Sequence, residues 1–107
     1  MTTYAVKWRE PNGQTFIGRL ALGPRSLRLD GRRRGAEEPP VNRRFRYEEL
    51  QSLRIGSRGV DRLDGRPALI VEWHEGAYLV AGAGMGAPIV QELVDRLVEL
   101  RLDAAGR

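Results

Sequence analysis

The stretch from Gly82 to Leu102 constrains the fold more than any other part of the sequence. A run rich in glycine and alanine is followed by Pro88, a residue favoured in the first turn of a helix. From there on, apolar residues recur at helical spacing and cover about half of the helix circumference, more than the ~100° stripe that one contact needs. We expect an α-helix over about residues 87–102, and the sequence indicates no second long helix. This helix must therefore cover a β-sheet.

The residues before this helix are typical of short β-strands. Apolar and polar side chains alternate, and turn signals such as Asn12-Gly13, Gly23-Pro24 and Glu75-Gly76 separate the segments. We expect about seven strands between residues 3 and 81, loops over 31–42 and 56–66, and a bulge or bend at Gly18. Seven strands form two packed sheets or a partly open barrel, whose open end the helix would cover. The residues expected in the core are Trp8, Phe16, Leu29, Phe45, Leu69, Val71, Trp73, Tyr78, Leu93 and Leu97.

Three segments together with the final helix resemble the bacterial pleckstrin-homology-like (PH-like, GRAM-like) domains. They are FIGRLALGPRSLRLDG at 16–31, FRYEELQSLRIG at 45–56 and PALIVEWHEGAYLVAG at 67–82. The resemblance implies a single domain over 1–107, a barrel of about seven antiparallel strands capped by a C-terminal α-helix. It also implies a binding or scaffold module rather than an enzyme. Eukaryotic PH domains that bind phosphoinositides have basic residues on their first hairpin; here Lys7, Arg9 and Arg19 occupy a comparable region, while the turn at 11–14 is uncharged.

Length and composition fit one folded domain in the cytoplasm. A chain of 107 residues, 41% hydrophobic and 30% charged, supports one core. The absence of cysteine excludes disulfides, thiolate metal sites and a cysteine nucleophile, and no apolar run approaches the ~18 residues of a membrane span. We expect a cytoplasmic protein, with peripheral attachment to a membrane left open.

Two features suggest chemistry, and neither predicts an enzyme. Residues 82–87 match G-x-G-x-x-A between a strand and a helix, but a dinucleotide fold needs a second parallel strand, and only five residues follow Leu102. The stretch is expected to be a corner, although amides at a helix start could also accept an anion. His74 is the sole histidine and has no second histidine or cysteine with which to hold zinc. We expect no catalytic residue, no cofactor and no metal.

Arginines are the main candidates for binding. Residues 1–66 carry 15 basic and 8 acidic side chains (+7), and residues 67–107 carry 3 and 6 (−3). A basic loop could contact an acidic protein or an anionic membrane. Nucleic acid is less expected, because the nearby Phe45 and Tyr47 are assigned to the core. The alternative is a solvated loop whose arginines reflect genomic codon bias. The anion-binding candidates are Arg32, Arg33, Arg34, Arg43, Arg44, Arg46, Lys7 and Arg19.

The helix also predicts self-association. Val94, Val98 and Leu102 lie progressively off its sheet-facing seam and form a ridge, with Arg101 at the edge. Two copies about a two-fold axis would cover this ridge, unless the 31–42 loop folds over it. The function expected is a non-catalytic binding or scaffold module with a protein partner or a second copy of itself. The alternative is a binder of phospholipid headgroups or nucleic-acid phosphate through residues 32–46.

Overall fold

A computed structural model describes residues 2–33, 35, 37–56, 62–63, 66–82 and 87–105. Seven antiparallel strands of six to eight residues precede one C-terminal helix, which confirms the predicted fold class. The elements are β1 (Thr2–Arg9), β2 (Thr15–Leu22), β3 (Ser26–Arg33), β4 (Val41–Arg46), the 3-10 turn η1 (Tyr47–Glu49), β5 (Leu50–Gly56), the two-residue β6 (Arg62–Leu63), β7 (Arg66–Trp73), β8 (Gly76–Gly82) and α1 (Ala87–Ala105).

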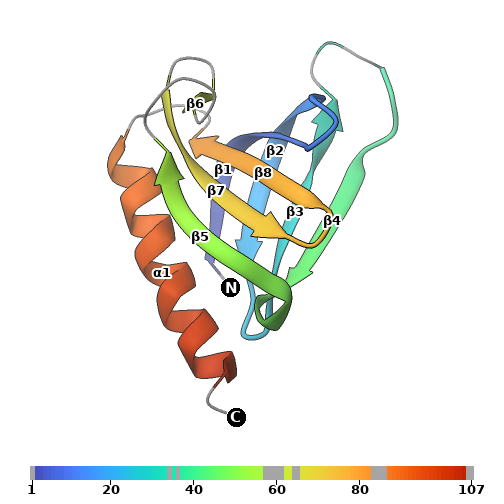
Figure 1. Cartoon of the computed structure of the whole chain (residues 1–107). Coiled ribbons are helices and arrows are strands. Elements are labelled where there is room, and N and C mark those ends of the chain that lie inside the picture. The colour runs from blue at the N-terminus through green and yellow to red at the C-terminus, as the bar shows by residue number, and fades with distance from the viewer. Residues whose placement is uncertain are drawn as a thin grey trace.

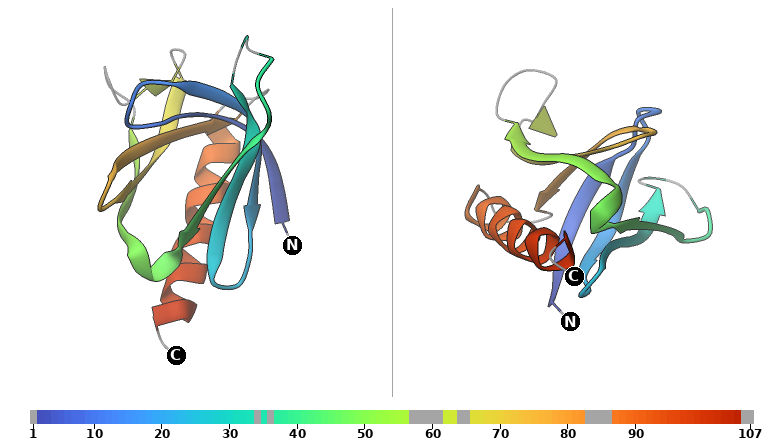
Figure 2. Two further views of the ribbon diagram at one scale, coloured as in Figure 1. Left: turned by 90° about the vertical axis from the view of Figure 1, so that its right-hand side faces the viewer. Right: turned by 60° about the horizontal axis from the view of Figure 1, so that its bottom comes forward.

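The strands form one sheet in the order β4-β3-β2-β1-β8-β7-β5, with β6 paired to β7. β4 and β5 are the two ends of this sheet, yet only the three residues of η1 separate them in the chain. The sheet must therefore curl until its ends meet at one corner, and Figure 1 shows the resulting half-barrel. α1 packs along its open side against η1, β5, β7 and β8 (Figure 2). This is a PH-like arrangement.

The main core fills the concave side of the sheet. Trp8 stacks on Phe16 with ring centroids 5.3 Å apart. The rings of Phe45 and Tyr78 pack in a T-shaped arrangement with their centroids 4.8 Å apart. The helix contributes Leu93 and Leu97, both buried, and burial of such side chains stabilises the fold by ~1.5–3 kcal/mol each. The ten predicted core residues are buried here, except that Trp73 is half-buried at the end of β7.

β7 and β8 are buried on both faces. On the convex side, Ile70 and Leu79 pack with Leu63 of β6 in a second, smaller cluster. Alternation along β7 predicted one buried face, and residues 56–66 were expected to be loop only. The short β6 within that segment pairs with β7 and supplies Leu63, which packs against the second face.

Gly18 lies opposite Gly31 in the β2–β3 register, which runs through both residues without a bulge. A Cβ on Gly18 would collide with the backbone of Asp30, and one on Gly31 would reach within 2.8 Å of the Trp8 ring. The pair therefore allows close backbone approach beneath a core tryptophan. The expected irregularity of the sheet lies elsewhere, in β5 between Leu50 and Ser52.

Three element boundaries differ from expectation. β3 continues to Arg33 and β4 starts at Val41, so most of the arginine-rich segment is paired strand instead of loop. The helix begins at residue 87 as expected and continues to 105. Within the described part of the chain, no helix is long and apolar enough to cross a membrane.

Candidate binding surface

The convex face of β1–β4 gathers positive charge from four strands. Antiparallel pairing places outward-facing residues in three cross-strand rows, because residues opposite each other point to the same side. These rows contain five cations and one carboxylate. The rows are Thr3–Ala21–Arg28–Arg44, Ala5–Arg19–Asp30–Asn42 and Lys7–Ile17–Arg32. We call this surface the cationic face.

Of the eight predicted anion-binding residues, four lie in these rows and a fifth continues them. Lys7, Arg19, Arg32 and Arg44 belong to the rows, and Arg46 follows outward-facing Arg44 on β4. Arg46 is exposed and forms a 3.2 Å ion pair with Glu48. Arg19, Arg32 and Arg44 are exposed and form no ion pair with another residue that the structure describes.

The other three predicted arginines do not share this face. Arg33 has the opposite strand parity and pairs with Glu38 at 3.3 Å. Arg43 also has the opposite parity and contacts Glu10. Arg34 lies outside the described residues.

Arg28 and Asp30 belong to the cationic face, although the sequence did not single them out. The Arg28 Nε donates to an oxygen of Asp30 at 2.7 Å, and the amide of Asn42 donates to the other oxygen. Asp30 lies opposite Arg19 and two residues from both Arg28 and Arg32. The signal was present, because Arg28 alternates with core residues Leu27 and Leu29.

A shallow groove of about 570 Å³ runs over the middle of the cationic face. Aliphatic groups line part of it, including Ile17, which is 44% exposed, Ala21 and Pro40. The charged groups that line it are Arg19, Arg28, Arg32 and Asp30. The groove thus combines apolar surface with guanidinium groups, which suits a partner that presents carboxylates beside aliphatic side chains.

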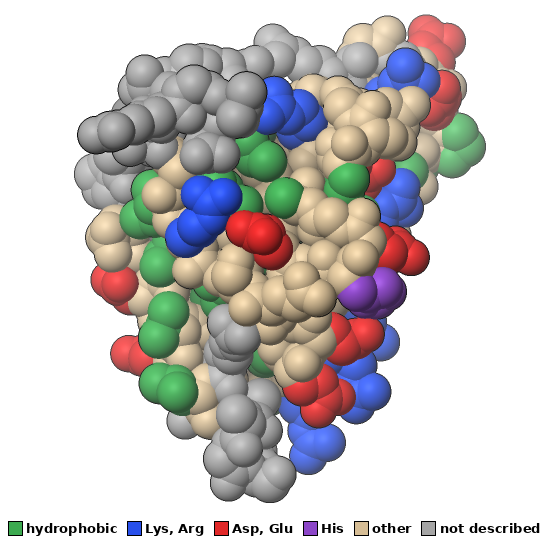
Figure 3. All heavy atoms as spheres, in the orientation of Figure 1, with side chains coloured by type: hydrophobic (Ala, Val, Ile, Leu, Met, Phe, Trp, Pro, Cys, Tyr) green, Lys and Arg blue, Asp and Glu red, His purple; other side chains and the backbone are tan. Residues whose placement is uncertain are grey.

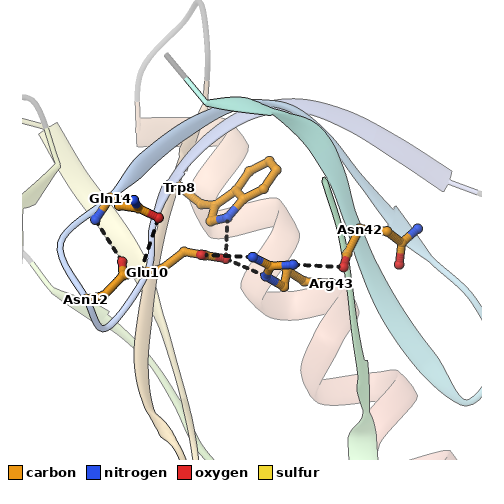
Figure 4. A network of polar contacts seen from close by, with 6 residues as sticks. All are labelled: Trp8, Glu10, Asn12, Gln14, Asn42 and Arg43. Atoms are coloured by element: carbon orange, nitrogen blue, oxygen red, sulfur yellow. Dashed lines mark hydrogen bonds and ion pairs between the residues drawn. The ribbon is translucent and has the colours of Figure 1, made fainter. Parts of the chain in front are cut away.

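A second polar cluster lies where β1 meets the turn at 11–14 (Figure 4). Glu10 is buried, with only 6% of the residue exposed. Its carboxylate accepts hydrogen bonds from Arg43 Nε at 2.7 Å, from Arg43 Nη2 at 3.2 Å and from Trp8 Nε1 at 3.4 Å. The hydrogen bond to Glu10 raises the pKa of the Arg43 guanidinium above its ordinary value. Burial, together with the charge of Glu10, raises the pKa of the nearby Tyr78 phenol.

This cluster adjoins a pocket of about 390 Å³ that Trp73, Glu75 and Tyr78 also line. The indole nitrogen of Trp73 is buried and has no hydrogen-bond partner among the described residues. Sequence reasoning missed Glu10 as a buried charge. Its position two residues after Trp8, on the same strand face, was the available signal.

The helix presents a second surface to solvent. Val98 is 43% exposed and Leu102 is 68% exposed, whereas Val94 is half-buried and packs against the core. Exposed carboxylates of Glu92, Asp95 and Glu99 lie on the same side of α1. Over α1, at the left of Figure 3, hydrophobic and acidic side chains lie next to one another. The side chain of Arg101, the remaining predicted interface residue, is outside the described part.

His74 is exposed, and its Nε2 lies 3.9 Å from a carboxylate oxygen of Glu75. The centroid of its ring lies 4.6 Å from the ring centroid of Trp73. Across the described residues, no group of three or more His, Cys, Asp or Glu side chains could hold a metal ion. Residues 83–86 of the G-x-G-x-x-A stretch lie outside the described part.

No protein-family model matches this sequence, and no characterised protein matches it by sequence. Its fold is similar to that of the C-terminal domain of an unknown protein from Leishmania infantum, known from a crystal structure. The TM-score is 0.63 at 14% sequence identity, and the match covers 95% of this chain and 83% of that one. At this level of identity, the likeness concerns the fold alone.

Proposed function

We propose that this chain is a non-catalytic binding module of the bacterial PH-like and GRAM-like group, and that its cationic face binds an acidic surface of a protein partner. The observation that carries the proposal is the convergence of Lys7, Arg19, Arg28, Arg32 and Arg44 from four strands onto one face. Such a face attracts anionic partners and orients them before contact.

The groove favours a protein partner over a phosphate-rich one. Its exposed aliphatic surface at Ile17 and Pro40 can pack against aliphatic side chains of a partner. Asp30 lies in the central row and pairs with Arg28, which lowers the net positive charge that the face offers to a dense row of phosphates. Stacking of nucleobases needs exposed aromatic rings, whereas Trp8, Phe16 and Phe45 of these strands face the core.

Direct binding measurements test this function. The probe is a labelled decapeptide of alternating glutamate and alanine, compared with phosphatidylserine vesicles and a short DNA duplex. We expect peptide binding that weakens with salt and that Arg32→Glu reduces about tenfold, equivalent to ~1.4 kcal/mol. Arg54→Glu makes the same charge change on β5, away from the cationic face, and should have little effect.

Two results would contradict the proposal. Equal loss of peptide binding in Arg32→Glu and Arg54→Glu would mean that net charge, and not this face, attracts the peptide. Binding to vesicles or duplex without binding to the peptide would replace the acidic protein by a phosphate-bearing partner.

A further inference from the structure

We infer that the acidic partner of the cationic face is a second copy of this chain, whose helix α1 docks there with its outer surface. This inference rests on the proposed function, because it names the occupant of the same face. The outer surface of α1 carries the exposed acidic and aliphatic side chains that we call the helix ridge, namely Glu92, Asp95, Val98, Glu99 and Leu102.

The helix ridge has the chemistry that the groove would accept. Val98 and Leu102 are one helical turn apart and are the helix's exposed large hydrophobic residues in the described part. Asp95 and Glu99, also one turn apart, are exposed beside them. Arg96 is exposed on the same helix, so the exposed charged side chains described on α1 are three carboxylates and one guanidinium, and their sum is acidic. Aliphatic and carboxylate groups thus alternate on a single rigid element.

The two surfaces also match in size. Arg28 and Arg32 are four residues apart on β3, which corresponds to ~13 Å along a strand. A helix is ~10–12 Å across with its side chains, so α1 of another copy can lie between these two guanidinium groups. In that position the helix would lie over the row of Arg19 and Asp30, because Ile17 shares a row with Arg32 and Ala21 shares a row with Arg28. Its aliphatic side chains would pack beside Ile17, and its carboxylates would face the arginines, while Asp30 stays paired with Arg28.

One copy cannot satisfy its own cationic face in this way. The inner side of α1 packs on η1, β5, β7 and β8, and Leu93 and Leu97 fix it in the core. The cationic face belongs to β1–β4, on the convex side of the sheet. Each copy therefore presents one ridge and one face, and each of these needs the complementary surface of another copy.

This contact is head-to-tail and differs from the two-fold dimer expected from the sequence. That dimer needs a ridge of Val94, Val98 and Leu102, but Val94 packs against its own core. A contact between two different surfaces builds a ring or a chain of copies, unlike a contact between two identical surfaces. Association should therefore grow with concentration and weaken with salt, because charges meet across the interface.

Charge reversal on each surface separately tests the assignment. The face variant carries Arg19→Glu and Arg32→Glu, and the helix variant carries Asp95→Arg and Glu99→Arg. Sedimentation velocity should show association for the wild type and a monomer of 12.0 kDa for each variant alone. An equimolar mixture of the two variants should associate again, because each supplies a surface complementary to one on the other. Arg54→Glu and Glu75→Arg are the controls, and circular dichroism verifies that every variant is folded.

Several outcomes would overturn the inference. These are a wild type that stays monomeric at high concentration and low salt, a folded helix variant that still associates, and a mixture that remains monomeric. A two-fold helix contact would instead survive in the face variant and be lost in Val98→Glu. The helix variant keeps an unaltered cationic face, so its binding to the alternating peptide tests the proposed function separately. In the wild type, peptide binding without self-association would reject this inference alone. Failure of both the wild type and the helix variant to bind the peptide would reject the proposed function as well.

Discussion

The neighbouring arginines Arg43 and Arg44 have opposite roles because a strand alternates its side chains. Arg44 points to the convex face, while Arg43 points toward the core, where it contacts Glu10. The Glu10 side chain is 5% exposed and that of Arg43 is 37% exposed, so the pair is buried at its acidic end only. A carboxylate in such a place needs its donors, since a buried acceptor without a partner costs ~1–3 kcal/mol.

We therefore predict that Arg43→Met lowers the free energy of unfolding by ~1–3 kcal/mol, because it leaves the Glu10 carboxylate with the indole of Trp8 as its remaining described donor. Arg44→Met, the matched control, should change it by less than ~0.5 kcal/mol. Urea unfolding followed by tryptophan fluorescence measures both. Adding Glu10→Gln to Arg43→Met should recover part of the lost free energy of unfolding, because the charged carboxylate is then removed. Equal destabilisation by Arg43→Met and Arg44→Met would contradict the burial argument.

At the scale of the element, α1 is stabilised by packing on one side. Leu93 and Leu97 are 2% and 0% exposed, whereas Gln91 is exposed and bonded only to Asp95 of the same helix among the described residues. Tyr4 of β1 donates a 3.4 Å hydrogen bond to Glu92, which ties the helix to the strand at the centre of the sheet. The helix thus closes the half-barrel through a narrow seam.

Leu97→Ala should accordingly destabilise the whole fold by ~2–5 kcal/mol, the range for a buried leucine that leaves a cavity. Gln91→Ala, on the solvent side of the same helix, should lie within ~0.5 kcal/mol of the wild type. Thermal unfolding at a concentration low enough to exclude association checks both. A similar melting temperature for the two variants would mean that the helix does not close the core.

Local patterns predicted which elements form but not all that they contact. Alternation at Leu27, Arg28 and Leu29 predicted the buried side of β3 correctly, because one face of that strand is buried in the core and the other is exposed to solvent. The run of arginines at 32–34 has no such alternation, so the sequence pattern does not indicate that β3 continues to Arg33. Burial of Ile70 on the second face of β7 depends on Leu63, and no local pattern indicates this contact.

The candidate site was predictable in composition and not in arrangement. Arg32 and Arg44 are recognisable as candidates from charge alone. That they share one face with Lys7 and Arg19 follows from the registers β1–β2, β2–β3 and β3–β4, which join residues far apart in sequence. The same registers place Arg43 among the core-facing side chains, which a charge count cannot show.

At the scale of the whole molecule, Tyr47 ties the corner where the two ends of the curled sheet meet to the β2–β3 turn. It is the first residue of η1, the turn that joins edge strands β4 and β5. Its backbone N–H donates to the carbonyl of Arg25 at 3.0 Å, and its hydroxyl donates to the carbonyl of Gly23 at 2.7 Å. Both acceptors lie in the β2–β3 turn, so one residue, through its backbone and its side chain, holds the corner of the half-barrel against an adjacent hairpin.

This corner makes stability depend on alkaline pH. Burial raises the pKa of the Tyr47 phenol to about 12, above the value of ~10 for an unfolded chain. The folded state therefore keeps a proton that the unfolded state loses. The contribution of this proton to stability is complete below pH ~10 and is lost as the pH rises toward ~12, by up to ~3 kcal/mol.

Tyr47→Phe separates this effect from other titrations. At neutral pH the variant should be less stable by ~0.5–1.5 kcal/mol, because it lacks the hydroxyl that donates to Gly23. Phenylalanine does not ionise, so the difference should shrink above pH ~10 and reverse before ~12. Tyr78, whose pKa burial also raises, is present in both chains and largely cancels in the difference. Urea unfolding of both chains across this range measures the crossing, and a difference that stays constant would show that the folded corner does not hold Tyr47 in its neutral form.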